Sequence, residues 1–371
     1  MNDNLNEALP KPIVAILTMP DTVRQLRGNL ANFQDIITTG KQLGFPVYVV
    51  TVKDLKLKSP LVRGYIPNRD GSEWESQLFP LPQIIYNRIP QREDELKPFV
   101  RRKIEAILEH PNLAIFNPFF FNKWHLFEWL KSSKLTAPLV PATRQLNTPK
   151  QLFKMLERYP TLYLKPVNGK AGKGIMLLRL QKDKPLPYRL QIQHQKNSIT
   201  YKAASLKRLW NRIKKETDGS PYIMQQAIDL ITVDNRPFDL RLLLQKNNRG
   251  HWSISGLGAR LAGQKSITTH VPRGGSIENP LKLLESAFGS EHANSIIRKV
   301  RTNALIIAKQ IEKACGYRLG EMSMDLGVDK TGANWFFEAN ARPMKFDEEP
   351  IRKKSLQRIF DYSLYLANQK T

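Results

Sequence analysis

Runs of apolar residues alternate with amphipathic stretches through the first third of the chain. Ile13 to Thr18 forms one short apolar run, and residues 45–52, 82–89 and 113–117 form three more. Between the first two runs, apolar positions recur with helical spacing from about Val23 to Leu43. Strands that alternate with helices predict a small parallel α/β unit, which we place at residues 1–117. Its first turn has no glycine-rich motif, so the pattern does not predict a nucleotide-binding Rossmann domain.

A second unit is predicted at residues 118–230. Asn122 is suited to cap the helix that begins in FNKWHLFEWLKSS. Further along, the pattern predicts a helix at 149–158, two strands joined by a loop in TLYLKPVNGKAGKGIMLLRL (161–180), a basic amphipathic helix from Lys202 to Glu216, and a strand in YIMQQAIDL (222–230).

A third unit is predicted at residues 231–371. FDLRLLLQ and HWSISGLGARLA are apolar runs separated by the turn sequence KNNRG, which favours an antiparallel pair of strands. A long helix is expected from about Glu291 to Cys315 and another at the C-terminus. Between them, EMSMDLGVDKTGANWFFEAN (321–340) has the pattern of a hairpin with its turn at residues 330–333.

The hairpin brings acidic residues together. If Asp329 pairs with Asn334, Asp325 lies directly opposite Glu338. Like charges at facing positions destabilise a sheet, so the pair calls for a cation. Asn340 follows Glu338 on the same face, and carboxylate and amide oxygens are ligands that Mg²⁺ prefers. The predicted core face holds Met324, Leu326, Val328, Trp335, Phe337 and Ala339; the opposite face holds Glu321, Ser323, Asp325, Glu338 and Asn340. The pattern therefore predicts a divalent-metal site rather than a solvated strand end.

A glycine-rich loop follows Lys165. Gly169, Gly172 and Gly174 would let backbone amides approach phosphate oxygens. The segment after Gly174 is apolar and strand-like, whereas a P-loop opens into a helix. We therefore expect a mobile lid between two strands, the alternative being an ordinary glycine-rich turn. The strand in YIMQQAIDL could offer its backbone to an adenine edge, although a plain core strand has the same pattern.

Composition adds a strong positive charge. The 371 residues include 58 Lys and Arg against 33 Asp and Glu, a net charge of +25, which favours anionic partners. The segment from Lys182 to Lys215 holds ten basic residues and one acid, a pattern also typical of a solvated helical face. The single Cys315 excludes an internal disulfide and fits a reducing cytoplasm. No apolar run approaches the roughly 20 residues of a membrane helix, the polar N-terminus is unlike a secretory signal, and no zinc-ligand spacing occurs.

The order of these motifs resembles the ATP-grasp superfamily over about residues 117–345. YLKPVNGKAGKGI, YIMQQAIDL, GLGARL…SITTHVPRGG and NWFFEANARP are similar to the YheC/YheD group of spore-forming bacteria, which is described as spore-coat-associated. The resemblance implies an N-terminal pre-ATP-grasp unit followed by a two-subdomain ATP-grasp fold.

The resemblance also implies roles for individual residues. Lys123 and Lys165 would contact ATP phosphates under the loop of Gly169, Gly172 and Gly174. The adenine pocket would be lined by Gln225, Gln226, Ala227 and Ile228, with Asp229 near the ribose, where many relatives have a glutamate. The transferred phosphoryl charge would be stabilised by Arg241 and Arg260, and Mg²⁺ would be held by Asp325, Glu338 and Asn340. Arg88 and Arg273 are candidates for binding an acceptor carboxylate. Arg273 is also one of the candidate catalytic arginines. His270 is the histidine expected to face the site and contact the substrate.

The resemblance implies an ATP- and Mg²⁺-dependent carboxylate–amine ligase that acts through an acylphosphate. Its acceptors are not specified by the sequence; a peptide or an anionic wall component fits the positive charge. An alternative is a spore-coat-associated structural protein that binds ATP without ligation. A nucleic-acid-binding function is disfavoured, because no aromatic-rich basic strand or known nucleic-acid motif occurs.

Overall fold

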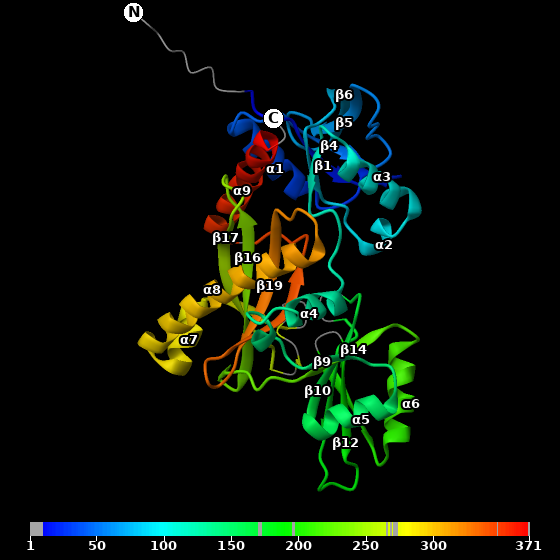
Figure 1. Ribbon diagram of the computed structural model, residues 1–371, viewed down its shortest axis with the longest axis vertical. Helices are drawn as coiled ribbons and strands as arrows, with labels where there is room; N and C mark the ends of the chain where they lie inside the picture. Colours follow the sequence, from blue (N-terminus) through cyan, green and yellow to red (C-terminus); the bar gives the residue numbers. More distant parts are fainter. Residues whose placement is uncertain are drawn as a thin grey trace, which may run out of the picture.

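The computed structural model describes residues 10–169, 173–194, 197–264, 266–267, 269, 274–346 and 348–369. Three sheets follow one another along the longest axis, with helices packed against each (Figure 1). This is the predicted α/β architecture: one N-terminal α/β unit, and two further sheets that face each other across a cavity. In the described part of the chain, no helix is long and apolar enough to cross a membrane.

The first sheet has the strand order β6-β5-β4-β1-β7-β8. Strands β4, β1, β7 and β8 are parallel, as predicted, while β5 and β6 add an antiparallel hairpin at one edge. The hairpin escaped prediction because β6 is largely exposed and lacks an apolar run. The elements of this unit are β1 (Val14–Thr18), β2 (Pro20–Asp21), β3 (Gln25–Leu26), α1 (Leu30–Gln42), β4 (Val47–Thr51), β5 (Leu61–Pro67), β6 (Trp74–Pro80), β7 (Ile84–Asn87), α2 (Arg92–Glu95), α3 (Pro98–Glu109) and β8 (Ala114–Phe116).

Helix α1 begins later than the periodicity suggests. The predicted start at Val23 is wrong, because Gln25 and Gly28 have positive φ angles that a helix does not tolerate. The short strands β2 and β3 occupy this segment, and the side chain of Asn29 caps the helix by accepting from the backbone N–H of Asn32.

The second sheet is antiparallel, with the order β13-β12-β11-β10-β14-β9. Its apolar side chains form a core with those of α5 and α6. Part of the predicted helix from Lys202 is strand, because Ser205 caps α6 and the helix starts only at Leu206. The elements are α4 (Lys123–Lys131), the 3₁₀ helix η1 (Ala137–Leu139), β9 (Thr143–Gln145), α5 (Pro149–Arg158), β10 (Thr161–Pro166), β11 (Met176–Leu180), β12 (Tyr188–His194), β13 (Asn197–Ala203), α6 (Leu206–Thr217) and β14 (Tyr222–Gln226).

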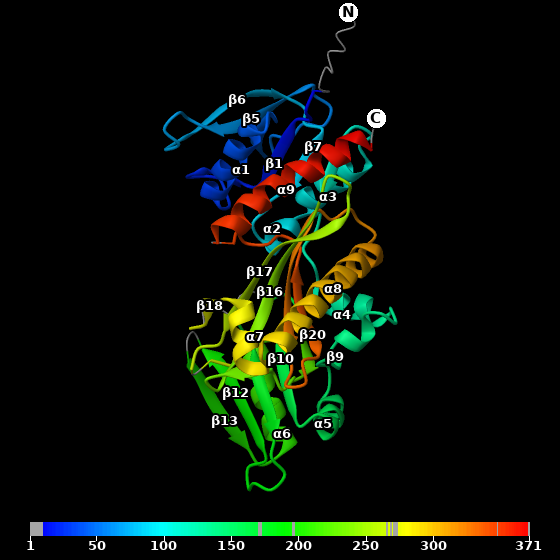
Figure 2. The same ribbon diagram turned by 90° about the vertical axis from the view of Figure 1, so that its left-hand side faces the viewer.

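The third sheet has the order β18-β17-β16-β19-β20, with β15 paired to β16. Its apolar face packs against α4, α7 and α8, so the opposite face is available to carry polar side chains (Figure 2). The elements are β15 (Thr232–Val233), β16 (Arg236–Lys246), β17 (Trp252–Leu261), β18 (Ser276–Glu278), α7 (Pro280–Phe288), α8 (Ser290–Cys315), β19 (Glu321–Val328), β20 (Asn334–Asn340) and α9 (Glu349–Asn368). Helix α9 returns to the first sheet, where Phe360 and Tyr362 join the core formed with α1.

The β19–β20 hairpin contains a bulge that changes the predicted register. Val328, not Asp329, pairs with Asn334, and the ladder runs from Leu326–Phe336 directly to Asp325–Glu338. Phe337 is the extra residue. Prediction of Trp335 and Phe337 in the core is therefore wrong: Phe336 is fully buried there, whereas Phe337 lines a cavity. The facing of Asp325 and Glu338 is confirmed because the bulge offsets the shift at the turn.

Candidate active site

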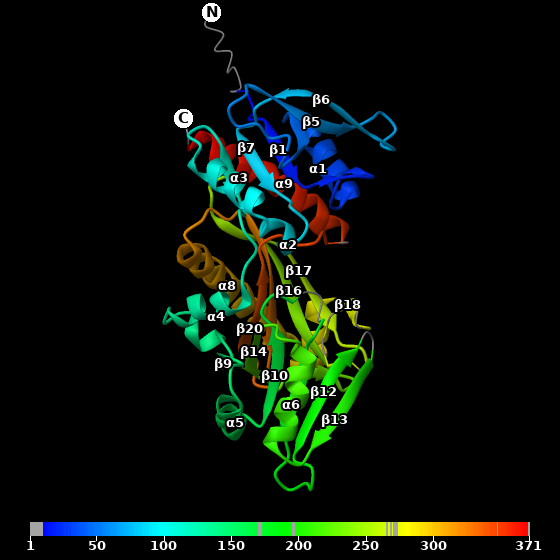
Figure 3. The same ribbon diagram turned by 90° about the vertical axis from the view of Figure 1, so that its right-hand side faces the viewer.

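A cavity of about 460 Å³ lies between the second and third sheets, a volume typical of small-molecule sites. Figure 3 shows the two sheets one below the other, with β10 and β14 close to the end of the third sheet. One part of the wall is mainly apolar, and the other carries charged groups. The apolar and aromatic lining comprises Tyr163, Ile175, Leu177, Ile228, Leu230, Ile267 and Phe337.

Lys165 lies in the polar part of the cavity, at the end of β10. Its ammonium group donates to Gln225 Oε1 at 2.7 Å and lies 5.5 Å from the ring centre of Phe337. Burial lowers the pKa of Lys165 to about 8, and the positive charge of Lys123 acts in the same direction. Nearby carboxylates oppose this shift. Lys165 is therefore a desolvated cation whose charge is poorly balanced in the free protein, which suits it to bind an anion.

Gln225 lines the cavity as predicted, and its side chain also contacts Lys165. It is 1% exposed, accepts from Lys165, and donates through Nε2 to Thr143 Oγ1 at 2.9 Å. Its side chain therefore orients Lys165. Gln226, Ala227 and Ile228 line the cavity as predicted, beside the apolar wall.

Lys123, the first residue of α4, meets Glu338 from β20. The Nζ–Oε1 distance is 2.8 Å, and the two side chains are 12% and 20% exposed. Asn122 fixes the start of α4 by accepting from the backbone N–H groups of Trp124 and His125. The predicted helix cap thus places one phosphate-binding candidate against one metal-ligand candidate.

Arg260 from β17 joins two buried carboxylates. It donates to both oxygens of Asp239 at 2.9 Å and forms a 2.7 Å ion pair with Asp325. Asp239 also accepts from the hydroxyl of Thr269. These two carboxylates raise the pKa of Arg260 against the opposing effect of burial. The sequence analysis did not identify Asp239 as a site residue. The signal was its position in DLRLLL, two residues before Arg241, which puts both side chains on one face of β16.

Arg241 and Asn340 lie further along the same polar face. Arg241 contacts Asp325 Oδ1 and Ser323 Oγ, each at 3.3 Å, and Asn340 pairs with Ser323 across the hairpin. Neither Arg241 nor Asn340 lines the cavity. The polar face therefore continues from the cavity toward the first sheet.

The metal site was predicted on the premise that Asp325 and Glu338 face each other without a basic partner. The structure shows that both acids have basic partners. Arg260 and Arg241 pair with Asp325, and Lys123 pairs with Glu338, so the chain supplies cations of its own. Among the described residues, no group of three or more His, Cys, Asp or Glu is arranged to hold a metal. The oxygen-only set of Asp325, Glu338 and Asn340 nevertheless has the ligand chemistry of a hard cation that retains waters and substrate oxygens.

The sequence and the structure were compared with those of known proteins. Residues 112–366 match the model of the YheC/D-like ATP-grasp family. The chain belongs to this family.

The endospore coat-associated protein YheD of Bacillus subtilis is 26% identical over 369 residues, covering 96% of this chain and 79% of that protein. D-alanyl-alanine synthetase A of Vibrio cholerae has the same fold, with a TM-score of 0.53, 14% identity and coverage of 98% and 99%. The ATP-grasp ligase PsnB, complexed with a minimal precursor, Mg and ADP, has a TM-score of 0.51, 13% identity and coverage of 96% and 98%. These two structures establish the ATP-grasp fold of the chain.

In this ATP-grasp chain, the remaining predicted residues have different positions. Gly169 lines the cavity, whereas Gly174 does not; Gly174 has a positive φ, and its carbonyl accepts from the hydroxyl of Tyr222. Asp229 is exposed at the cavity edge and pairs with Lys330 at 2.7 Å. Gly172, His270 and Arg273 lie outside the described residues.

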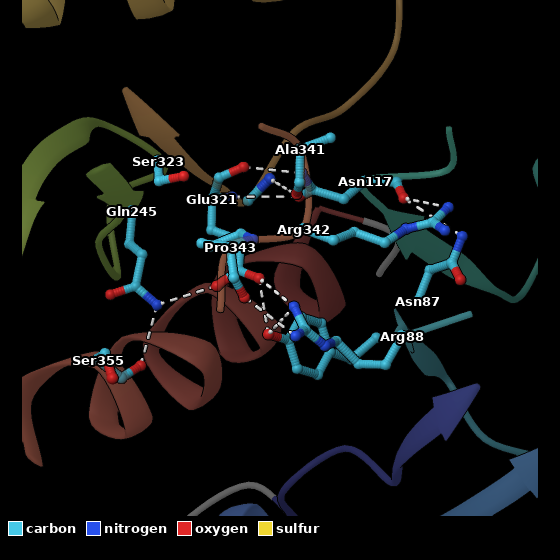
Figure 4. A network of polar contacts seen from close by, with 12 residues as sticks. Asn87, Arg88, Asn117, Gln245, Glu321, Ser323, Ala341, Arg342, Pro343 and Ser355 are labelled. Carbon is cyan, nitrogen blue, oxygen red and sulfur yellow. Dashed lines mark hydrogen bonds and ion pairs between the residues drawn. The ribbon is translucent and has the colours of Figure 1, made fainter. Parts of the chain in front are cut away.

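Arg88 lies away from the ATP-grasp cavity, at the junction with the first sheet. It pairs with Glu321 at 3.2 Å and donates to the backbone carbonyl of Pro343 at 3.0 Å (Figure 4). Tyr86 donates to the same Glu321 carboxylate at 2.7 Å. This site is continuous with the polar face of β19, where Ser323 and Asp325 follow Glu321 at alternate positions.

Proposed function

We propose that the chain is an ATP- and Mg²⁺-dependent ligase that joins a carboxylate to an amine. The carboxylate oxygen would attack the γ-phosphorus of ATP, releasing ADP and forming an acylphosphate. The amine would then attack the acyl carbon, phosphate would leave, and the amine would lose a proton. The observation that carries the proposal is the cavity, in which an apolar wall adjoins Lys123, Lys165 and the facing pair Asp325 and Glu338.

The apolar wall is suited to the adenine base. Ile175, Leu177 and Ile228 present aliphatic surface, and Ala227 continues the chain beyond β14 along the same wall. An aromatic purine is bound well between such side chains, because contact removes apolar area from water. Placing the base here directs the triphosphate toward the charged residues. Asp229, at the cavity edge, would be the candidate to bind a ribose hydroxyl.

The charged part of the cavity is suited to the triphosphate. The Lys165 ammonium donates to the neutral amide oxygen of Gln225, so an anionic phosphate would add a direct charge-assisted contact to this desolvated cation. Lys123 can exchange its contact with Glu338 for a phosphate oxygen. Phosphoryl transfer needs mainly such positioning and charge neutralisation, and little covalent chemistry from the protein.

Mg²⁺ would be held by Asp325, Glu338 and Asn340 together with phosphate oxygens and water. When bound, it would neutralise charge on the transferred phosphoryl group. Lys123 and Arg260 balance the two carboxylates in the free protein and would then share them with the metal. Arg241 lies beside Asp325 and could act on the acceptor side of the transfer. The predicted catalytic role of Arg273 and the predicted substrate role of His270 stay predictions.

The acceptor would bind along the polar face between the cavity and Arg88. Arg241 and Arg88 lie on this side of the cavity, paired with Asp325 and Glu321, and would share these contacts with an anionic acceptor such as a peptide carboxylate or a wall component. The coat association of YheD and YheC in Bacillus subtilis supports a link of this chain to the spore coat or cell envelope. The alternative is a coat protein that binds ATP without ligating anything.

Release of phosphate tests this function. The protein with ATP and Mg²⁺ should release phosphate only when a suitable carboxylate and amine are present, among amino acids, peptides and wall fragments. Mass spectrometry should find a product lighter by one water than the sum of its two precursors. Variant Lys165→Ala serves as the blank for contaminating ATPases. ATP binding without phosphate release across the panel would favour the coat-protein alternative, and absence of ATP binding would refute both.

A further inference from the structure

The segment 117–122, which we call the linker, joins β8 of the first sheet to Lys123 at the start of α4. It runs beside the end of β20, so the chain that leads to Lys123 and the chain that leaves Glu338 are neighbours (Figure 4). Two buried residues connect these strands and the linker: Asn117 and Arg342. Neither was predicted to have a role.

Asn117 contacts both ends of the hairpin through one side chain. Its Nδ2 donates to the backbone carbonyls of Glu321 at 2.7 Å and Ala341 at 2.5 Å. Its Oδ1 accepts from the backbone N–H groups of Gly320 at 2.8 Å and Glu321 at 3.1 Å. The residue is fully buried, and its φ of 57° is one that asparagine tolerates better than most side chains. The start of β19 and the exit of β20 are thus fixed relative to the linker.

Arg342 fixes the linker from the opposite direction. It follows Ala341 at the exit of β20, donates to the carbonyl of Pro118 at 2.9 Å, and lies 4.1 Å from the ring centre of Phe120. It also forms a 2.6 Å ion pair with Glu95. The same Glu95 carboxylate accepts from the backbone N–H of Phe120 at 3.0 and 3.1 Å. The linker is therefore held to the hairpin and to the first sheet's unit at the same point.

These contacts act on the Lys123–Glu338 pair from both sides. Lys123 lies six residues after Asn117, and Glu338 lies three residues before Ala341. We infer that Asn117 and Arg342 are positioning residues that hold Lys123 against Glu338. A displacement of the linker relative to the hairpin exit would separate the lysine from the carboxylate. The importance of the pair for phosphate binding rests on the proposed function, but the positioning itself does not.

Chemical labelling of Lys123 tests the inference without nucleotide. Asn117→Gly removes the side chain while tolerating the positive φ. Lys103, a half-buried lysine on α3, serves as internal reference. In this variant, the ratio of the acetylation rate of Lys123 to that of Lys103 should rise about fivefold or more above the wild-type ratio. Peptide mass spectrometry measures the ratio. Arg342→Lys should raise the same ratio, because lysine keeps the charge beside Glu95 but not the contact with Pro118.

Asn87→Ala is the matched control. Asn87, at the end of β7, is also fully buried, and it donates to the carbonyls of Asn117 and Pro118, so it ties the linker to the first sheet and not to the hairpin. It should lower the melting temperature and leave the Lys123-to-Lys103 ratio unchanged. An unchanged ratio in both Asn117→Gly and Arg342→Lys, or an equal increase in all three variants, would overturn the inference. If Asn117→Gly does not fold, the comparison of Arg342→Lys with Asn87→Ala decides.

A nucleotide titration then separates the inference from the function on which it rests. Asn117→Gly should weaken ATP binding by about the factor seen in labelling, and Asn87→Ala should not. Wild-type protein that fails to bind ATP would refute the proposed function while the labelling ratio still reports on positioning. A raised labelling ratio with unaltered ATP affinity would refute the functional role of the Lys123–Glu338 geometry.

Discussion

Replacement of Arg260 by methionine is expected to lower the free energy of unfolding by about 3–5 kcal/mol, the usual cost of leaving buried charges without their partner. Arg260 is 6% exposed and neutralises Asp239 and Asp325, which are 5% and 3% exposed. Without it, Asp239 retains the hydroxyl of Thr269 and Asp325 retains Arg241. Denaturant unfolding of wild type and variant measures the loss.

Arg212→Met is the control, because Arg212 and Glu216 form a partly exposed pair within α6 that is expected to contribute only about 0.3–0.5 kcal/mol. Equal effects of the two replacements would show that Arg260 is not the main balance for the two acids.

Replacement of Lys165 by alanine is expected to weaken ATP binding at least about tenfold while the fold is retained. The lost contact is a charge-assisted one in a desolvated cavity, where it is stronger than at the surface. Lys184→Ala removes the same net charge from an exposed position and should change the affinity little. Calorimetric titration measures both. Similar affinities for wild type and Lys165→Ala would exclude Lys165 from the binding site.

The lowered pKa of Lys165 makes ATP binding depend on pH. In the free protein, burial and the charge of Lys123 hold this pKa at about 8, against Glu338, Asp239 and Asp325. A bound triphosphate favours the ammonium form, so above pH 8 binding should take up a proton and affinity should fall by up to about tenfold per pH unit. Calorimetry in two buffers of different ionisation enthalpy detects this uptake. Equal uptake by Lys165→Ala would assign the proton to another group.

Local patterns were sufficient to predict the elements that hold the site. The hairpin pattern predicted that Asp325 faces Glu338, although from a register that was one residue off at the turn, and the cap at Asn122 located the start of α4. Lys165 was predicted to contact phosphate because a lysine at a strand end before glycines suits that chemistry, and the structure places it in the cavity wall. These features depend on neighbours in sequence or on a single hairpin, in which the alternation of side chains limits the possible registers.

The partners of these residues could not be predicted, because they come from distant parts of the chain. Lys123 and Glu338 are 215 positions apart, and Arg260 reaches Asp325 from another strand. The sequence therefore indicated an uncompensated acidic pair where the fold supplies cations. The bulge at Phe337 also had no signature, since both phenylalanines are equally apolar and only tertiary packing selects Phe336 for the core.

A structure of the protein with Mg²⁺ and a non-hydrolysable ATP analogue tests the central claim most directly. The account predicts the base against Ile175, Leu177 and Ile228, and phosphate oxygens at hydrogen-bond distance, roughly 3 Å, from Lys165 Nζ. It also predicts density for a metal between the phosphates and the Asp325–Glu338 pair. A nucleotide bound outside the cavity, or one in the cavity with its phosphates directed away from Lys165, would contradict the account.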